Sequence, residues 1–276
     1  MCRCRAFGRR SGASVGGYIH GYDPAEVARL VRQARVLARW TMEDVWFPRG
    51  GRVLEVGCGV GAELLLLQEL HPEVDLIGLD LSESQLDAAR VQLAARPVPL
   101  VRASGVGLPF GDGSLDGIFT CWLLEHVPDP SALLAECRRV LKAGAPIYAR
   151  EVDNDSFRVW PESRALDRLL ATMNGVQRSF GGDPVVGRRL HALLLAAGFR
   201  SVQISLPAVY SDATHGVAHR ELCTYFHDLL RSTVPACVAA GLAPEVAAEA
   251  LAHLAALADH PLGAVVHVPR FAAAAA

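Results

Sequence analysis

A short glycine-rich segment is the part of the chain whose residue types and spacing point most directly to chemistry. Residues 52–56 form a mostly apolar segment that contains Glu55. Gly57, Gly59 and Gly61 follow it directly. Glycines in such a turn let the backbone approach a ligand closely at the N-terminus of the helix that follows. The segment therefore predicts a nucleotide-type binding site.

The spacing of these glycines discriminates between cofactors. Dinucleotide folds use G-x-G-x-x-G to seat a pyrophosphate on the helix dipole, whereas this chain has G-x-G-x-G. S-adenosylmethionine (SAM) has no phosphate, and Glu55 is a suitable neighbour for its ammonium and sulfonium groups, directly or through water. Asp80 ends the next apolar run, about 20 residues further on, where a carboxylate can accept hydrogen bonds from both ribose hydroxyls in NAD and SAM sites alike.

Alternating strands and helices are predicted around these residues. Short buried strands are expected at 52–56, 74–80, 99–102, 115–121 and 145–152, with amphipathic helices at 62–70, 83–95 and 131–141. Repeated β–α units of this length predict a doubly wound, mostly parallel sheet, because right-handed crossovers have few other solutions.

Additional segments flank the predicted sheet. We expect a disordered tail at 1–17 and one domain at 18–276, divided into a lid helix region (18–50), a SAM-binding core (51–152) and two helical cap insertions (155–200 and 214–261). Further strands are expected at 202–210 and 264–270, with an interruption of the second insertion near Pro235. The terminal alanines 272–276 are expected to fray.

Composition excludes several classes of function. The chain has 276 residues, of which 51% are hydrophobic and 20% charged, and its formal net charge of −2 provides no field that would gather nucleic acid. No apolar run approaches the ~20 residues of a membrane helix, and the N-terminus lacks the apolar stretch of a secretory signal. The 7 scattered cysteines are typical of a reducing compartment. We therefore expect a cytoplasmic protein without membrane or nucleic-acid partners, and a homodimer is compatible with the apolar cap helices.

Cysteine and histidine spacing does not predict a metal site. The pair Cys2 and Cys4 has one intervening residue instead of the two of a zinc motif, and no second pair follows. His215, His219, Cys223 and His227 recur at helical spacing, but no carboxylate partner is fixed beside them. Cap packing or pocket lining is the favoured reading of that series.

A set of motifs then occurs in order along the core. They are VLEVGCGVG (53–61), IGLDLS (77–82), LPF (108–110), SLDGIF (114–119), LLEHVPDP (123–130) and VLKAGAPIYARE (140–151). In this order the sequence closely resembles the class I SAM-dependent methyltransferases that act on small molecules, the group containing ubiquinone and menaquinone biosynthesis methyltransferases. The resemblance implies a Rossmann-like sheet of seven strands with an antiparallel last strand, SAM as cofactor and S-adenosylhomocysteine as product.

The resemblance also implies roles for individual residues in holding SAM. It assigns cofactor contacts to Gly57, Gly59, Gly61, Asp80, Leu81 (on the adenine) and the backbone carbonyl of Cys121 (towards the ammonium). One position departs from the family pattern, because Ser104 stands where an Asp usually binds the adenine amino group. Adenine contact is therefore expected from the Ser104 hydroxyl and the Gly105 backbone. Tyr18 and His20 precede the first helix and are expected in a lid over SAM.

Methyl transfer requires alignment and exclusion of water, and it needs a base only if the acceptor must lose a proton. His126 is the candidate base, since it follows the fourth strand and has a reference pKa of about 6.5. The alternatives for His126 are to hold the loop or to touch SAM. Glu125 is expected to orient His126, contact a polar acceptor or bind a cation; the alternative is a capped turn residue.

Four other acceptor contacts are considered, each with an alternative. Asp153, with Glu151 and Asp155 beside it, follows the fifth strand and lines either the acceptor pocket or a solvated loop. Arg188 opens a helix, where it contacts an anionic group or forms a salt bridge within the cap. Trp122 and Tyr225 supply either an aromatic acceptor pocket or core packing.

The sequence therefore predicts a SAM-dependent methyltransferase acting on a small, partly apolar acceptor in metabolite or natural-product biosynthesis. The acceptor atom, whether oxygen, nitrogen, carbon or sulfur, is open at this stage. One alternative keeps the fold and SAM but catalyses a non-methylating reaction such as cyclisation or decarboxylation. Others are a degenerate binding protein, for which Ser104 is the hint, and an NAD-dependent oxidoreductase, which the glycine spacing disfavours.

Overall fold

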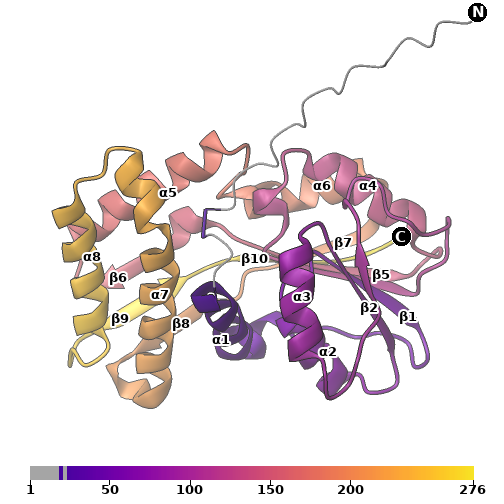
Figure 1. Ribbon diagram of the computed structural model, residues 1–276, viewed down its shortest axis with the longest axis horizontal. Helices are drawn as coiled ribbons and strands as arrows, with labels where there is room; N and C mark the ends of the chain where they lie inside the picture. The colour runs from indigo at the N-terminus through magenta and orange to yellow at the C-terminus, as the bar shows by residue number, and fades with distance from the viewer. Residues whose placement is uncertain (1–18, 21–23) are drawn as a thin grey trace, which may run out of the picture.

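The main structural unit is a twisted sheet covered by helices on both faces (Figure 1). The computed structural model describes residues 19–20 and 24–276, so the predicted tail and Tyr18 lie outside the described residues. Within that part of the chain the sheet has 7 strands, β1 (Arg52–Val56), β2 (Asp75–Asp80), β3 (Leu100–Arg102), β4 (Gly117–Cys121), β5 (Pro146–Glu151), β7 (Arg200–Ser205) and β10 (Arg270–Ala275).

The topology of this sheet confirms the predicted fold class. Its strands follow the order β3-β2-β1-β4-β5-β10-β7. Strands β1 to β5 pair in parallel, whereas β10 is antiparallel to both β5 and β7. The sheet is therefore a mostly parallel, Rossmann-like sheet with an antiparallel last strand.

Helices bury both faces of the sheet, which explains why its inner strands are mostly apolar. They are α2 (Ala62–Leu70), α3 (Glu83–Gln92), α4 (Pro130–Val140) and α6 (Leu190–Ala196). One apolar cluster packs α4 and α6 on one face, and a second packs α2 and α3 on the other. Every residue of β4 is buried as a result.

A second lobe, on the left in Figure 1, forms the cap. It consists of a three-stranded antiparallel sheet and helices that share their own apolar cluster. Its elements are β6 (Arg158–Trp160), β8 (Val209–Asp212), β9 (Ala264–His267), α5 (Arg164–Ser179), α7 (Val217–Ala239) and α8 (Pro244–Leu257). Helix α1 (Pro24–Thr41) contacts α7 and α2 and so lies between the two lobes. None of the described helices combines the length and apolarity needed to cross a bilayer.

Short 3-10 turns complete the chain and carry several residues of interest. They are η1 (Leu124–His126), η2 (Asn154–Ser156), η3 (Val186–Arg189) and η4 (Ala213–His215). The range 155–200, predicted as a cap insertion, also contains α6, which packs against α4 and β7 of the main sheet.

The C-terminal region differs from its prediction. Residues 264–267 form a strand of the cap sheet, and four of the alanines expected to fray, 272–275, belong to β10, inserted between β5 and β7. Backbone hydrogen bonds on both sides and burial of Ala272 and Ala274 outweigh the low strand propensity of alanine. Likewise the predicted strand 202–210 is divided between β7 and β8, and α7 continues through Pro235.

Candidate active site

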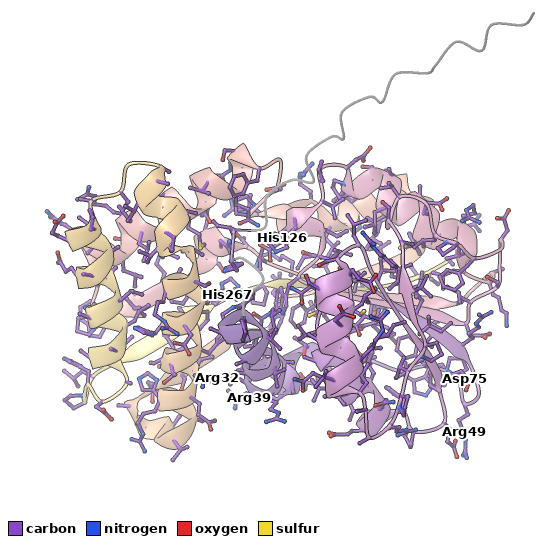
Figure 2. The ribbon with its side chains drawn as sticks, in the orientation of Figure 1. Arg32, Arg39, Arg49, Asp75, His126 and His267 are labelled. Carbon is purple, nitrogen blue, oxygen red and sulfur yellow. The ribbon has the colours of Figure 1, made fainter. Side chains whose placement is uncertain are left out.

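A cavity of about 910 Å³ lies between the carboxyl ends of the parallel strands and the cap. Its walls come from the loop after β1, the end of β2, the turn after β4, helix α1 and the cap helices α5 and α7. Figure 2 shows His126 and His267 at the junction of the two lobes. The volume lies near the upper end of the ~300–1,000 Å³ range of ligand sites, which is sufficient for a cofactor together with a small second molecule.

The glycine loop forms one wall of the cavity. Gly57 and Gly59 line it and have positive φ angles of 76° and 48°. A Cβ at Gly57 would lie 2.7 Å from a methyl group of Leu123, so only glycine fits there. Gly61 does not line the cavity; a Cβ there would meet Ala89 and Leu93, and this glycine permits close packing of α2 on α3.

Asp80 occupies the end of β2 and faces the cavity, as its predicted role requires. Its two carboxylate oxygens accept hydrogen bonds from the backbone N–H of Gly59 (2.9 Å) and of Ser82 (2.8 Å). Burial raises the pKa of Asp80, and these backbone hydrogen bonds act in the opposite direction. A carboxylate offers about four acceptor sites, so Asp80 can also accept hydrogen bonds from the two hydroxyl groups of a ribose.

The remaining predicted cofactor residues in the described part of the chain lie on the cavity wall, with one exception. Leu81 lines the cavity and is 50% exposed, so a nucleobase would cover an otherwise uncovered apolar side chain. Ser104, Gly105 and Cys121 line it too. A Cβ at Gly105 would lie 2.7 Å from the buried Leu133 side chain, so glycine at this position permits close packing of the cavity wall on the core.

Glu55 is the exception. It is 1% exposed, does not line the cavity, and has one carboxyl oxygen without a hydrogen-bond partner among the described residues. Burial, followed by the neighbouring Glu63 and Asp80, raises the pKa of Glu55 well above its usual value. Glu55 is buried because it lies within β1, between β2 and β4, and not at the end of the strand. Its side chain therefore lies under the helices that cover the sheet.

Glu63, from α2, is the acidic residue that faces the cavity in this region, and sequence reasoning missed it. Burial raises the pKa of Glu63 to about 7, although its backbone hydrogen bond and Arg29 act in the opposite direction. A carboxyl group with this pKa can take up or release a proton near neutral pH.

Helix α1 contributes a polar stripe that sequence reasoning also missed. Arg29, which is 6% exposed, donates to both carboxylate oxygens of Glu26 (2.7 and 2.6 Å) and to the side-chain oxygen of Gln33 (2.7 Å). Arg29 and Gln33 line the cavity. The detectable signal was the spacing of these three polar residues, Glu26, Arg29 and Gln33, along one face of the helix.

The turn after β4 positions the candidate base. Trp122 has a φ of 53°, a strained conformation for a bulky residue. A carboxylate oxygen of Glu151 accepts from the backbone N–H of Leu123 (3.2 Å) and of Leu124 (2.8 Å), which holds the turn in place. Burial, and then Glu125, raise the pKa of Glu151 well above its usual value. Trp122 lines the cavity, and its indole N–H has no partner among residues 19–20 and 24–276.

Glu125 and His126 follow Trp122 on η1, and both line the cavity. One Glu125 oxygen lies 3.7 Å from Nε2 of His126, and the other accepts a 2.7 Å hydrogen bond from the Gln177 amide. Gln177, from α5, was not predicted. Its amide also donates to the Glu125 carbonyl oxygen (3.2 Å), so Glu125 is held from the cap.

A second histidine lies near His126. His20 lines the cavity, and its Nδ1 is 2.7 Å from the Ser232 hydroxyl of α7. Burial, and then the neighbouring Arg29 and His126, hold the pKa of His20 well below its usual value. His20 is therefore a neutral imidazole in the lid region where it was predicted.

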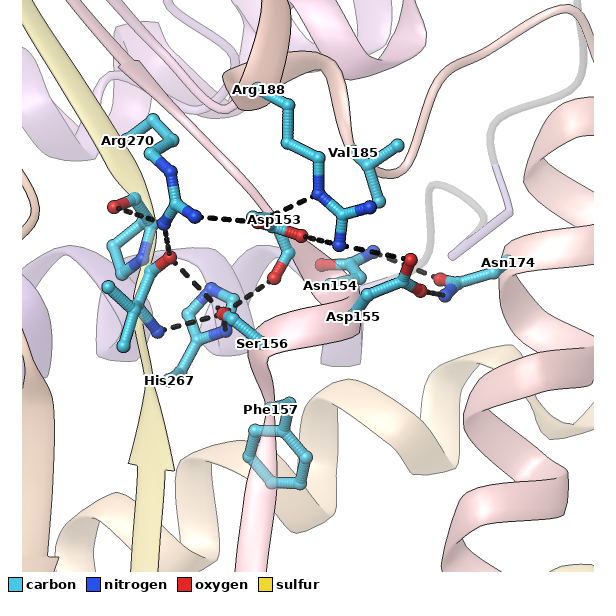
Figure 3. Close-up of polar contacts among 12 residues, drawn as sticks. Asp153, Asn154, Asp155, Ser156, Phe157, Asn174, Val185, Arg188, His267 and Arg270 are labelled. Atoms are coloured by element: carbon cyan, nitrogen blue, oxygen red, sulfur yellow. Dashed lines mark hydrogen bonds and ion pairs between the residues drawn. The ribbon is translucent and has the colours of Figure 1, made fainter.

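Two predicted substrate residues are located elsewhere. Asp153 and Arg188 do not line the cavity; they pair with each other, with 2.8 Å between an Asp153 oxygen and Nη2 of Arg188 (Figure 3). Arg270 also donates to Asp153 (2.9 Å). Asp153 is 2% exposed, and both guanidinium groups donate hydrogen bonds to its Oδ2, so its charge is paired within the protein. We therefore assign this cluster a structural role.

Tyr225, by contrast, lines the cavity as predicted. Its hydroxyl donates to the Gln33 side chain (3.4 Å), and its ring lies 4.8 Å from that of Phe226. Burial is the main reason that the pKa of Tyr225 is raised. Among the described residues, no group of three His, Cys, Asp or Glu side chains converges in a way that would hold a metal ion.

Comparisons with known proteins identify the family. Residues 54–149 match the methyltransferase domain family. O-methyltransferase cnsE of Penicillium expansum is 30% identical over 200 residues, covering 69% of this chain and 68% of the relative. The chain belongs to the class I SAM-dependent methyltransferases. The family supports SAM as the cofactor, and the glycine cradle and Asp80 fit it.

Two other relatives match part of this methyltransferase. A 37.1 kDa protein in transposon TN4556 of Streptomyces fradiae is 34% identical over 212 residues, covering 75% of this chain. A demethylmenaquinone methyltransferase of Staphylococcus aureus is 31% identical over 147 residues, covering 52% of this chain. The chain spans 58% of the Streptomyces protein and 61% of the Staphylococcus protein, less than two thirds of each.

Solved structures resemble this methyltransferase in fold. Phosphoethanolamine N-methyltransferase 2 of Haemonchus contortus gives a TM-score of 0.55 at 14% identity, covering 91% of this chain and 57% of that enzyme. A methyltransferase-like protein of Bacillus halodurans gives 0.54 at 18% identity, covering 87% and 97%. At these identities the likeness concerns the fold alone.

Proposed function

We propose that this methyltransferase transfers the methyl group of SAM to a hydroxyl group of a small, planar, largely apolar acceptor. The observation that carries the proposal is one cavity with the glycine loop and Asp80 on one side and Glu125, His126 and aromatic cap residues on the other. The names of two relatives, an O-methyltransferase and a demethylmenaquinone methyltransferase, support this acceptor class.

The cofactor side of the cavity has the groups that SAM requires. Gly57 and Gly59 would receive the methionine portion, Asp80 the ribose hydroxyls and Leu81 the adenine, while Glu63 would face the ammonium. When bound, SAM supplies a methyl group made electrophilic by the sulfonium. The protein therefore has to align the acceptor and exclude water, which the cap does by closing over the sheet edge.

The acceptor side has the groups that a hydroxyl requires. Nε2 of His126 faces Glu125, so Nδ1 would take the hydroxyl proton while the Glu125 carboxylate stabilises the imidazolium that forms. Gln177 holds Glu125 in that position from the cap. Glu125 and Gln177 are thus positioning residues in this proposal, and His126 is the catalytic base.

The test uses the full chain, labelled SAM and 2-naphthol as the acceptor probe. We expect wild-type protein to release S-adenosylhomocysteine and His126→Ala to release it roughly 100-fold more slowly, the lower end of the usual effect of a general base. Calorimetric titration should give the same SAM affinity for both proteins. His191→Ala, at an exposed position on α6 outside the cavity, is the matched control and should retain full turnover.

The alternatives predict different results. Loss of SAM affinity in His126→Ala would make His126 a cofactor contact, and unchanged turnover would remove it from catalysis. Tight SAM binding without S-adenosylhomocysteine release from a panel of hydroxylated aromatics would favour a non-methylating reaction. Undetectable SAM binding by the wild type would favour the alternative that the chain is a degenerate binding protein.

A further inference from the structure

The cap end of the cavity contains a histidine that the proposed reaction does not use. His267 is the last residue of β9 and lines the cavity together with Phe157 and Phe226. The two phenyl rings lie 4.5 Å apart, and each lies 6.2–6.4 Å from the imidazole. Aromatic rings at these separations form a wall against which a planar molecule can pack. His267 is the polar group in that wall.

The hydroxyl of Ser156 determines which nitrogen of His267 carries the proton. Ser156 Oγ lies 2.7 Å from the Asp153 carbonyl oxygen, its shortest contact, so it donates its single proton there. Its lone pairs then accept the backbone N–H of Val268 (2.9 Å) and Nδ1 of His267 (3.1 Å). Nδ1 of His267 is therefore the protonated nitrogen, and Nε2 carries a lone pair.

The segment behind His267 is held by charged groups, as Figure 3 shows. Asp153 is paired with both Arg188 and Arg270. Arg270 also donates to the carbonyl oxygen of Val268, the residue after His267. These contacts hold the end of β9 against the loop after β5. They therefore limit the positions available to the imidazole of His267.

The imidazole is neutral at physiological pH. Burial lowers the pKa of His267 to about 4; Asp153 acts to raise it and Arg270 to lower it. None of the hydrogen bonds described for residues 19–20 and 24–276 uses Nε2. A neutral acceptor atom beside aromatic rings suits an uncharged donor group on a planar molecule and does not suit an anion.

We propose that Nε2 of His267 accepts a hydrogen bond from a second hydroxyl group on the methyl acceptor, a planar polyhydroxylated aromatic molecule. The inference rests on the proposed function and adds a specificity residue to it. His126 would meet the hydroxyl that is methylated, and His267 would meet a hydroxyl that is not. An acceptor with one hydroxyl would leave Nε2 without a partner in an apolar wall, which weakens its binding.

The first experiment determines the tautomer in the wild-type full chain. Long-range ¹H–¹⁵N correlation spectra distinguish protonated from unprotonated ring nitrogens, and backbone correlations assign His267 among the 10 histidines. We expect a protonated Nδ1 and an unprotonated Nε2 at pH 7. A protonated Nε2 would make the ring a donor towards the cavity and would overturn the proposal.

The second experiment measures binding to the complex with S-adenosylhomocysteine. The probes are 2,7-dihydroxynaphthalene and 2-naphthol, which differ by one hydroxyl, and affinity is measured by fluorescence titration. We expect the wild type to bind the diol roughly fivefold more tightly, the effect of one net hydrogen bond. His267→Phe keeps an aromatic ring and removes the acceptor atom, so its preference should fall to about one.

His253→Phe, on α8 in the cap but outside the cavity, is the matched control and should keep the wild-type preference. A wild type without diol preference, or a preference that persists in His267→Phe, would overturn the role of His267. In either case SAM binding and methylation of 2-naphthol would still support the proposed function. Failure of the wild type to bind SAM would instead remove the proposed function itself.

Discussion

Asp80 links the two halves of the candidate cofactor site. One carboxylate orders both the glycine loop and the start of α3, through the backbone N–H groups of Gly59 and Ser82. Because these hydrogen bonds use about half of its acceptor capacity, the same group can also bind a ribose. The side chain therefore both organises and completes the site.

Replacing this carboxylate should weaken SAM binding. We expect Asp80→Ala to lower SAM affinity by roughly 10- to 100-fold, because two charge-assisted hydrogen bonds to the ribose and the anchor of the loop are lost together. Isothermal titration calorimetry measures the effect. Asp75→Ala, at the exposed opposite end of the same strand, is the control and should bind SAM normally. Equal affinities of the two variants would place the ribose elsewhere.

His267 also makes a testable contribution to stability. Its pKa is lowered to about 4 by burial, so between about pH 4 and pH 6.5 the unfolded chain binds a proton there and the folded chain does not. The free energy of unfolding must therefore rise with pH across this window, by up to roughly 3 kcal/mol. Glu63, whose pKa is raised to about 7, acts in the opposite sense, so only a difference between proteins isolates His267.

Urea unfolding of the wild type and His267→Gln at several pH values from 4 to 8 measures that difference. We expect the wild type's advantage to grow from pH 4 to about 6.5 and to stay constant above it. The exposed His191→Gln on α6 is the control. Parallel curves for the wild type and His267→Gln would contradict the neutral buried imidazole.

At the level of elements, ion pairs join the loop after β5 to η3. Arg188 of η3 pairs with Asp153, which has a side chain only 3% exposed, and with Asp155, which has a side chain 46% exposed. One guanidinium therefore contacts a buried and an exposed carboxylate, and the two should differ in their contributions to stability.

Alanine substitution of each carboxylate tests this difference. Asp153→Ala should lower the free energy of unfolding by roughly 1–3 kcal/mol, because it removes the buried carboxylate to which both Arg188 and Arg270 donate, although Arg188 keeps Asp155 as a partner. Asp155→Ala should lower it by less than about 1 kcal/mol, because water screens an exposed pair. Denaturant unfolding measures both. Similar losses in the two variants would show that burial does not determine how much each ion pair contributes to the free energy of unfolding.

At the level of the whole molecule, the last segment of the chain joins the two lobes. Residues 264–275 leave the cap sheet as β9 and enter the main sheet as β10, as Figure 1 shows. The arrangement places His267 in the cavity wall and Ala272 in the core of the sheet. The cap is therefore covalently continuous with an internal strand of the main sheet.

A charge in that strand should destabilise the entire fold. We expect Ala272→Asp to lower the free energy of unfolding by more than about 3 kcal/mol or to prevent folding, since the residue is 1% exposed between two strands. Ala252→Asp, on the exposed side of α8, should change it by less than about 1 kcal/mol. Circular dichroism and denaturant unfolding provide the measurement. Wild-type stability of Ala272→Asp would mean that the alanines do not form an internal strand.

Much of the fold and of the cofactor side of the site could be predicted from the sequence, because both depend on local patterns. A few neighbouring residues are enough to determine each of these features: the β–α alternation, the turn containing Gly57 and Gly59, and the acidic end of β2. Glycine conformation, strand burial and strand direction together bring such turns to one edge of a parallel sheet. The position of His126 at that edge follows from the same rule.

Tertiary structure alone decided the partners of residues distant in sequence. Asp153 meets Arg270 across 117 positions, His267 meets Ser156 across 111, and the low-propensity alanine strand inserts between β5 and β7. The burial of Glu55 and the exposure of Glu63 to the cavity likewise depend on how α1 and α2 cover the sheet. Local spacing determines where a side chain leaves the backbone, whereas burial and charge pairing, which determine what it does there, arise only when the lobes pack together.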